Sequence, residues 1–216
     1  MQHIDFEYTQ EQLHEIADGI LKQAKKLGAS DAQLEISEGI ETCVDILNQD
    51  IDNFESYYNS TLCLTVYIGK NKGSVGISQT SLNNIEPIIL HALDIAKYTQ
   101  AYDANGVADS QYIQTLPHTY PDLQLHNPVN MSHEDLITKA KELEQITLDL
   151  NPKSVRSDGS SITLGNYSFI SAASNGFNQG YQTTRFSNSV SIIADSGDLM
   201  QTDYWYSATV IPSLSK

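Results

Sequence analysis

The sequence contains little cysteine and no long hydrophobic run. Cys43 and Cys63 are its two cysteines, and neither belongs to a C-x-x-C pair, so a disulfide scaffold and a cysteine-based metal or redox motif are excluded. Both lie in β-like segments, where we expect small buried thiols. No stretch approaches the roughly 18 consecutive apolar residues of a membrane-spanning helix. The start, MQHIDFEYTQ, has neither the basic nor the apolar part of a secretory signal. These features predict a reducing, cytoplasmic location.

Basic residues are also scarce. Lys and Arg number 12 against 27 Asp and Glu, which gives a formal net charge of -15. Because nucleic-acid affinity comes from basic side chains that release counterions from phosphates, this charge argues against direct DNA or RNA binding. It also argues against adhesion to an anionic membrane surface. The chain of 216 residues is nevertheless long enough to bury a core without disulfides.

Three segments show the apolar spacing of helices, and each follows a capping-box pattern. The predicted helices cover residues 10–27, 84–98 and 133–150. Their capping pairs are Thr9 with Gln12, Asn83 with Glu86, and Ser132 with Asp135. Gly28 favours the end of the first helix, because glycine tolerates the left-handed conformation that often follows a helix.

Alternating residues predict strands around these helices. Leu62 and Leu64 alternate with Cys63 and Thr65, as in a sheet with one buried face. The predicted strands are residues 32–38, 41–48, 60–68, 73–79, 154–173, 178–195 and 199–211. This order predicts an α+β fold with helices packed on a largely antiparallel sheet, in the order α-ββββ-α-connector-α-βββ. The expected divisions are an αββββα unit (1–100), a Pro-containing connector (101–131) and a helix with long β-hairpins (132–216).

The stretch AASNG (172–176) is one residue short of the G-x-S-x-G turn that presents a nucleophilic serine. That turn needs a helix after Ser174, but the residues that follow have a strand pattern. All six histidines precede Ser174, whereas hydrolases with this turn place the base downstream. Asn-Gly between two strands is instead a strong hairpin signal, because both residues of a type I′ turn need positive φ. We therefore predict a hairpin at Asn175-Gly176.

Other candidate sites also have plainer interpretations. His133-Glu134 lacks the second histidine of a zinc helix, since Ile137 and Thr138 occupy the two relevant positions. We expect Glu134 and Asp135 to complement the helix dipole. The remaining candidates are Asp45, Asp50, Asp52 and Glu55 as acid/base carboxylates, His118 and His126 as a metal pair, and Lys70 and Lys72 as phosphate ligands. The pattern supports none of these roles.

Tyr204-Trp205-Tyr206 is a concentrated group of aromatic residues. In a strand, Tyr204 and Tyr206 share one face and Trp205 lies on the other. We expect these side chains to pack in the core, and a surface for a partner or peptide is the alternative.

Four stretches resemble the PmbA (TldE) branch of the PmbA/TldD family. They are LTVYIGKNKGSVGISQTSL (64–82), ALDIAKYTQAYDANGVAD (92–109), SNGFNQGYQTTRFS (174–187) and GDLMQTDYWYS (197–207). The resemblance covers nearly the whole chain in the same order. It departs from the family at ILNQDIDNFES (46–56), where members commonly have a basic residue and a glycine in the turn.

The resemblance implies the N-terminal region of a non-catalytic PmbA-like subunit, with a C-terminal region to follow. The family forms cytosolic zinc-dependent peptidase complexes that process or degrade small or unfolded peptides, including peptide modulators of DNA gyrase. Its TldD-type subunits hold zinc in an H-E-x-x-x-H motif, which PmbA-type subunits lack. We therefore expect no catalytic, cofactor-binding or metal-binding residue in this chain, zinc in a TldD-like partner, and extended peptides as substrates.

Two alternatives belong to other classes. In the first, the chain is a stand-alone or truncated domain that binds proteins or peptides and has no peptidase role. In the second, it is a serine hydrolase that uses Ser174. Homo-oligomerisation also stays open.

Overall fold

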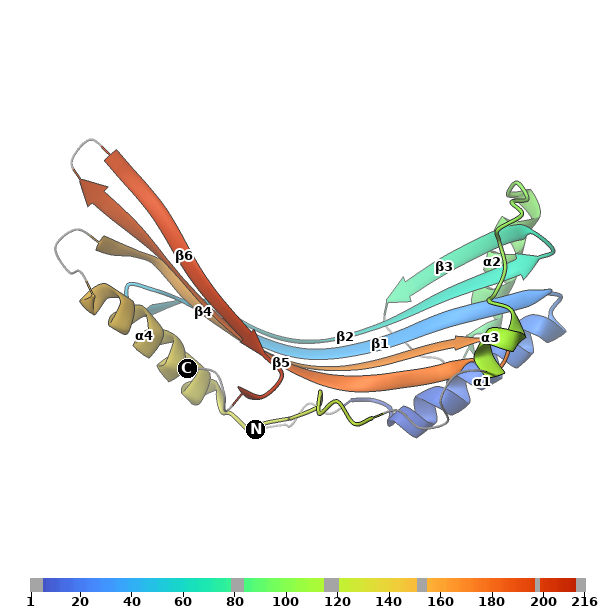
Figure 1. Cartoon of the computed structure of the whole chain (residues 1–216), viewed down its shortest axis with the longest axis horizontal. Coiled ribbons are helices and arrows are strands. Elements are labelled where there is room, and N and C mark those ends of the chain that lie inside the picture. The colour runs from blue at the N-terminus through green and yellow to red at the C-terminus, as the bar shows by residue number, and fades with distance from the viewer. Residues whose placement is uncertain (1–5, 79–83, 115–120, 151–154, 197–198, 213–216) are drawn as a thin grey trace. The chain divides into compact units, whose positions relative to one another are not determined.

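The chain folds into helices packed on an antiparallel sheet, which confirms the α+β prediction (Figure 1). The computed structural model describes residues 6–78, 84–114, 121–150, 155–196 and 199–212. The helices are α1 (Gln10–Lys26), α2 (Glu86–Tyr98), α3 (Ser110–Gln114) and α4 (His133–Asp149). The strands are β1 (Asp31–Leu47), β2 (Asp50–Ile68), β3 (Asn71–Ser78), β4 (Val155–Ala173), β5 (Asn178–Ser196) and β6 (Leu199–Thr209).

The six strands form one sheet in the order β3-β2-β1-β4-β5-β6. β2 pairs antiparallel with β3, and β5 pairs antiparallel with β6. The chain divides into two compact units, and β1, β2, β4 and β5 contribute residues to both. Unit 1 comprises residues 1–39, 59–122 and 167–182, and unit 2 comprises residues 40–58, 123–166 and 183–216. The contiguous divisions expected from the sequence stay a prediction.

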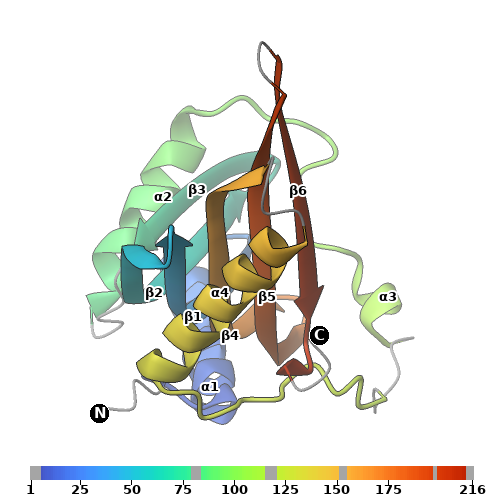
Figure 2. The same ribbon diagram turned by 90° about the vertical axis from the view of Figure 1, so that its left-hand side faces the viewer.

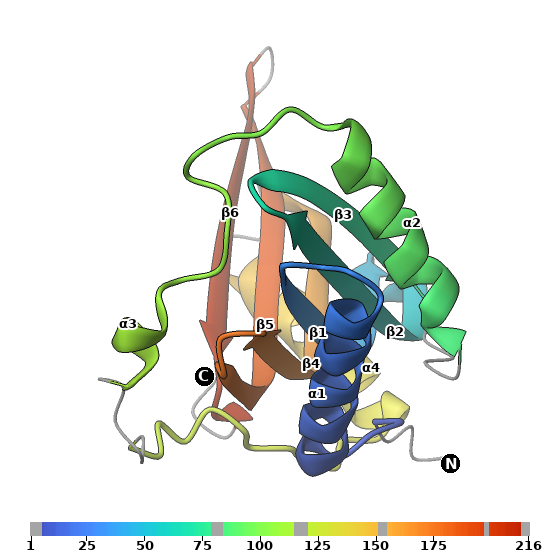
Figure 3. The ribbon, with the colours of Figure 1, turned by 90° about the vertical axis from the view of Figure 1, so that its right-hand side faces the viewer.

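Unit 1 has its own hydrophobic core beneath α1 and α2 (Figure 3). Leu13 and Ala17 of α1 and Ile89 of α2 are fully buried in it. The strands contribute alternate residues to this core, such as Leu34 of β1 and Leu64 of β2. Their neighbours along the strands, Gln33, Glu35 and Cys63, are exposed. One face of the sheet in unit 1 is thus buried and the other carries solvent-exposed side chains.

Unit 2 has a second core beneath α4, and Figure 2 shows α4 lying along β4 and β5. Its buried residues come from α4 and three strands: Val44, Ile46, Leu136, Ala140, Ile162 and Phe186. In the part of the chain that the structure describes, no helix is long and apolar enough to cross a membrane.

A buried carboxylate of α4 holds the turn between β1 and β2. Asn48 and Gln49 form this two-residue turn, and both have positive φ (53° and 67°), as a type I′ turn requires. Glu144, 1% exposed, accepts from the Asn48 backbone N–H at 2.9 Å and the Gln49 backbone N–H at 2.7 Å. It also accepts from the Ser157 hydroxyl. The charge-assisted bonds of Glu144 stabilise a turn that lacks the usual glycine.

Two of the three predicted capping boxes are confirmed. Thr9 with Gln12 caps α1, and Ser132 with Asp135 caps α4, each with both reciprocal bonds. Asn83 lies outside the described residues, and α2 begins at Glu86 without a side-chain cap bond. Proline in the first turn is tolerated there, because the first N–H groups of a helix have no partner within the helix.

The predicted strand pattern is wrong in the first part of the chain, where three strands replace four. The stretches 32–38 and 41–48 form the single strand β1, because Gly39 is extended and buried. A Cβ at Gly39 would lie 2.6 Å from the Asn59 side chain and 3.2 Å from the Tyr167 ring. Gly39 therefore permits close packing instead of a turn. β2 begins at Asp50, ten residues before its predicted start.

The expectation of two buried thiols is also wrong, since Cys63 is exposed and Cys43 is partly exposed. Cys63 lies between the buried residues Leu62 and Leu64, so its own side chain points to the exposed face of unit 1.

The predicted hairpin at Asn175-Gly176 is confirmed, but its turn type differs. The Gly176 N–H donates to the Ala173 carbonyl at 3.1 Å, and the Ala173 N–H donates to the Phe177 carbonyl at 2.8 Å. Gly176 has φ 97°, whereas Asn175 is not among the residues with positive φ. This pattern fits a type I turn followed by a left-handed glycine and not a type I′ turn.

Gly73→Ala should destabilise unit 1, because its new methyl would collide with the α2 backbone at Ala92 and Ala96. We expect a loss of about 2 kcal/mol in unfolding free energy, measured by urea denaturation. Gly76→Ala is the matched control in the same strand, since the nearest atom, the Cys63 Sγ, would lie 3.7 Å away. Equal stability of the two variants would contradict this packing.

Glu144→Gln should destabilise unit 2 by about 2 kcal/mol at neutral pH. Each carboxylate oxygen of Glu144 accepts from one turn N–H group, and the amide of glutamine has an NH₂ group in place of one of these oxygens. Burial raises the pKa of Glu144, but the bonds from Ser157, Gln49 and Asn48 outweigh it and hold the pKa below its ordinary value of 4.5. The stabilisation is therefore complete above the unfolded-state pKa and is lost as pH falls through the lowered folded-state pKa.

Urea denaturation across pH tests this expectation. The gap in stability between wild type and Glu144→Gln should shrink in acid, while Glu142→Gln, an exposed neighbour on α4, should match wild type throughout. A gap that is independent of pH would show that the charge of Glu144 does not stabilise the turn.

Candidate functional site

The most unusual surface of unit 2 is the aromatic strand β6. Tyr204, Trp205 and Tyr206 are 68%, 75% and 66% exposed, so the expectation of core packing is wrong. Leu199 and Met200 of the same strand are exposed as well. β6 is at the edge of the sheet, and none of these side chains is covered by a helix or strand in the described structure. Exposed apolar patches of this kind commonly mark interaction surfaces.

The side chains of β6 are ordered by its pairing with β5. Tyr204 lies opposite Ser191, and Tyr206 lies opposite Ser189. The two tyrosine rings are stacked, with centroids 6.5 Å apart and planes inclined by 18°. Trp205 lies opposite Val190 and therefore on the other face, as predicted from the alternation. Both faces of this edge strand thus present an aromatic side chain to solvent.

A groove with acidic lining lies beside Tyr204. Its volume is about 330 Å³, and its charged side chains are Asp45, Asp52 and Asp158. Asp158 accepts from the Ser191 hydroxyl at 3.0 Å, and Asp45 accepts from the Asn53 amide at 3.2 Å. Asp45 and Asp52, two of the four weighed carboxylates, are thus brought to one surface. Asp50 and Glu55 are exposed and are not part of this lining.

Ser174 has a structural position in unit 1. Its hydroxyl donates to Asp31 at 2.9 Å and accepts from the Ala32 backbone N–H at 3.1 Å. The Ser174 backbone N–H donates to the Ala32 carbonyl at 2.8 Å. These three bonds join the β4–β5 turn to the start of β1. No histidine is among the hydrogen-bond partners of the hydroxyl, and a strand follows the turn in place of the helix that a nucleophile turn requires.

The residues considered for metal binding are not brought together. His133 makes an edge contact with the Phe54 ring at 4.9 Å, and Asp135 caps α4. His126 is exposed, while His118 lies outside the described residues. Across the ranges that the structure describes, no group of three or more His, Cys, Asp or Glu side chains is placed to hold a metal ion. The described residues therefore do not fit a zinc site.

Of the two lysines considered for phosphate binding, Lys70 is engaged in a structural hydrogen bond and Lys72 is exposed to solvent. The Lys70 ammonium donates to the Asn105 carbonyl at 2.8 Å, and the Asn105 side chain donates to the Lys70 carbonyl at 3.0 Å. This pair fastens the connector to the β2–β3 turn.

Sequence analysis missed the short helix α3 and the groove that it borders in unit 1. Asp109 caps this helix by accepting from the Gln111 backbone N–H at 3.1 Å. An Asp followed by a few residues with little periodicity is a weak signal, so the helix was not predicted. Glu35 lines this groove. Its position between the apolar residues Leu34 and Ile36 indicates that its side chain lies on the exposed face of the strand, and this was the sequence signal for an exposed carboxylate.

Ser174→Ala should lower the unfolding free energy by about 1 kcal/mol, because the hydrogen bonds of its hydroxyl are lost. A fluorophosphonate probe should not label the wild-type protein, as intact-mass spectrometry would show. Labelling that disappears in Ser174→Ala would instead establish a nucleophilic serine.

Comparison with known proteins places this architecture in context. The family model described as the PmbA/TldA metallopeptidase central domain matches residues 126–215. The chain is 28% identical over 197 residues to a metalloprotease PmbA homolog of Haemophilus influenzae, covering 91% of this chain and 43% of that protein. It is 32% identical over 180 residues to the metalloprotease PmbA of Escherichia coli O157:H7, covering 83% of this chain and 39% of that protein. The chain therefore spans about two fifths of the length of these relatives.

Solved structures share the fold. A candidate modulator of DNA gyrase from Bacteroides thetaiotaomicron gives a TM-score of 0.83 at 22% identity, covering 94% of this chain and 46% of that one. TldE from Thermococcus kodakarensis gives 0.75 at 11% identity, covering 92% of this chain and 44% of that one. At these identities the structures establish the fold, while the curated relatives and the central-domain match extend the likeness to the sequence. The chain is similar to the PmbA branch of the PmbA/TldD metallopeptidase family over most of its length, and its residues 126–215 match the central domain of that family.

Proposed function

We propose that this chain is the N-terminal region of a non-catalytic, cytoplasmic PmbA/TldE-like subunit that holds an extended peptide for a zinc-dependent TldD-like partner. The substrates would be small or unfolded peptides, including peptide modulators of DNA gyrase. The observation that carries this proposal is the exposed aromatic edge strand β6 with its neighbouring acidic groove.

An edge strand can bind an extended peptide by pairing its free backbone groups with those of the peptide. The main-chain hydrogen bonds of such pairing do not depend on the side chains of the peptide, which suits a protein that handles varied sequences. Aromatic residues beside the edge add contact area with little loss of conformational entropy. Tyr204 and Tyr206 on one face, with Trp205 on the other, could flank an added strand.

The similar proteins, metalloprotease PmbA and a PmbA homolog, support a role for this chain in proteolysis. The similarity to a solved TldE supports a two-subunit assembly as the setting for this chain. The sequence contains no H-E-x-x-x-H motif, and the described side chains do not fit a zinc site. As part of this proposal, zinc and the hydrolytic step belong to the TldD-like partner, and we derive no chemistry from this chain.

Trp205 provides a direct test, because it is the single tryptophan of the sequence and is 75% exposed. Adding a TldD-like subunit and an unstructured peptide should shift its emission to shorter wavelength as the indole leaves water. The same mixture should slow hydrogen exchange in β5 and β6.

The double variant Tyr204→Ser with Tyr206→Ser keeps the reporter and should weaken the response at least about tenfold in affinity. Tyr98→Ser is the matched control, since Tyr98 is 90% exposed on α2 in unit 1. Unchanged emission together with unprotected β5 and β6 would rule out this peptide-holding surface.

The alternative is an interaction domain with no peptidase role, which the exposed aromatic strand also favours. A pulldown with a TldD-like protein separates the two. Capture supports the subunit, whereas failure of capture with the folded chain supports the stand-alone domain.

A further inference from the structure

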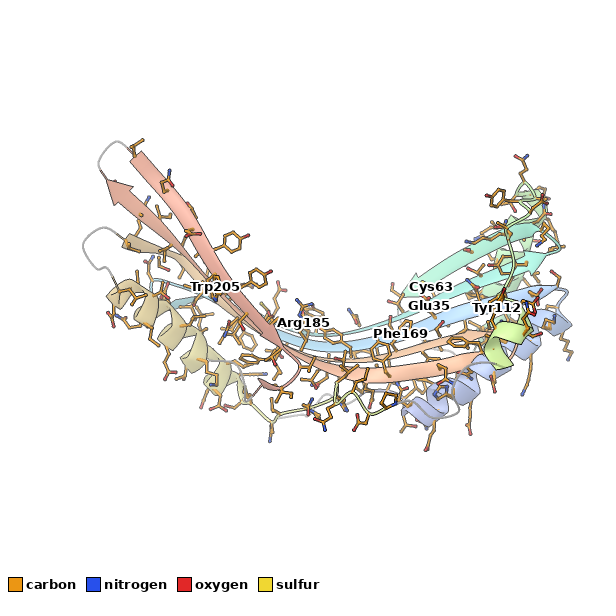
Figure 4. The ribbon with its side chains drawn as sticks, in the orientation of Figure 1. Glu35, Cys63, Tyr112, Phe169, Arg185 and Trp205 are labelled. Atoms are coloured by element: carbon orange, nitrogen blue, oxygen red, sulfur yellow. The ribbon has the colours of Figure 1, made fainter. Side chains whose placement is uncertain are left out.

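Unit 1 contains a second groove, on the sheet face opposite α1 and α2. Its volume is about 460 Å³, within the range of small-ligand sites. The floor is formed by alternate residues of neighbouring strands, including Glu35 of β1 and Cys63 of β2, which Figure 4 labels. Tyr112 and Ile113 of α3 form a wall, and Phe177 of the β4–β5 turn contributes a further aromatic ring.

Hydrogen bonds hold the wall in place. They fasten the segment that leads to α3 near Tyr102 and again near Ala108. The Tyr102 backbone N–H donates to the Lys70 carbonyl at 3.1 Å, next to the Lys70–Asn105 bonds described above. At the other end, the Asn175 side chain donates to the Ala108 carbonyl at 2.8 Å. Ala108 and Asn175 themselves line the groove. The groove therefore has a defined wall and is not simply a bare sheet surface.

Glu35 gives the groove its charge. It is the one carboxylate among the described residues of the lining, and within the described chain its side chain forms no hydrogen bond or ion pair. Two aromatic rings and an isoleucine contribute apolar surface to the groove, and uncharged polar residues such as Gln33 and Thr65 complete the floor. A carboxylate with aromatic neighbours is a combination that recognises cations on an apolar stem, because the carboxylate supplies charge and the ring faces supply cation–π attraction.

The charge of the whole chain favours the same kind of ligand. A formal net charge of -15 raises the local concentration of cationic molecules and repels anionic ones. The basic residue that binds the connector, Lys70, already donates to Asn105, and no lysine or arginine is among the described lining residues. The carboxylate is thus available to an incoming cation.

We propose that this groove binds the lysine or arginine side chain of an extended peptide, with Glu35 pairing its charge and Tyr112 and Phe177 packing on its stem. This inference rests on the proposed peptide-holding function and adds a preference for basic residues. The peptide chain then crosses the open face of unit 1, while β6 serves as a separate contact in unit 2.

Cys63 makes the proposal measurable, because its exposed thiol lies in the groove floor. In a Cys43→Ser background, the rate of alkylation by iodoacetamide reports on Cys63 alone. A short peptide with a central lysine should slow this alkylation, and the same peptide with norleucine should not. The norleucine peptide has the same apolar stem without the charge, so the comparison isolates the role of Glu35.

Glu35→Gln should weaken the protection by the lysine peptide by up to about fivefold, the upper end of the range for an exposed ion pair. Glu15→Gln is the matched control, since it changes net charge equally at an exposed position of α1. Each variant is compared with and without peptide, so that any difference in the alkylation rate of the free protein is removed from the comparison. Equal protection by norleucine and lysine peptides, or full protection in Glu35→Gln, would overturn the proposal.

The Trp205 measurement separates this inference from the proposed function. A Trp205 response without protection of Cys63 overturns the groove assignment and leaves the subunit role intact. Protection of Cys63 by the lysine peptide, with no capture by a TldD-like protein, supports the groove and removes the proposed subunit role.

Discussion

The structure depends on one constraint: each long strand buries alternate side chains beneath a helix. In unit 1, α1 and α2 cover Leu34 and Leu64, and in unit 2, α4 covers Ile46 and Phe186. Because successive side chains point to opposite faces, burial of one set sends the other set to solvent. In unit 1, the same alternation that builds the core therefore produces the exposed face on which the groove lies.

The two surfaces differ in chemistry. β6 presents stacked tyrosines and a tryptophan at a free sheet edge, where backbone pairing is available to another strand. The groove of unit 1 is bordered by the fastened connector, and Glu35 is the one carboxylate among its described lining residues. A protein that holds peptides of varied sequence gains from both, because edge pairing is indifferent to side chains and a charged groove is selective. In the proposed function, the similarity to metalloprotease PmbA is what gives this combination a peptidase setting.

Buried and partly buried polar groups have structural roles in this chain. Glu144 clamps a turn with two non-glycine residues at positive φ, and Ser174 ties a hairpin turn to β1. Each is a group that could be mistaken for a reactive one when its neighbours are unknown. Their partners are backbone N–H groups and other polar side chains, which is the ordinary way that folded proteins satisfy buried polar atoms.

Local signals in the sequence predicted much of the fold. The starts of α1 and α4 follow from capping boxes, because the two residues of each box are three positions apart and need no tertiary contact. The last three strands follow from long alternating runs, and their predicted bounds are within two residues of the observed ones. Asn-Gly predicted the β4–β5 hairpin, although the turn type was decided by its own hydrogen bonds.

The sequence by itself determined where α1 and α4 begin, where the last three strands lie and which of their residues share a face, because these properties depend on neighbours along the chain. Only the tertiary structure decided that Gly39 continues a strand, since its close neighbours Asn59 and Tyr167 are distant in sequence. Only the tertiary structure decided that Tyr204, Trp205 and Tyr206 are exposed. Alternation assigns side chains to two faces, but the packing of a second layer decides whether a face is buried, and that depends on how distant segments meet.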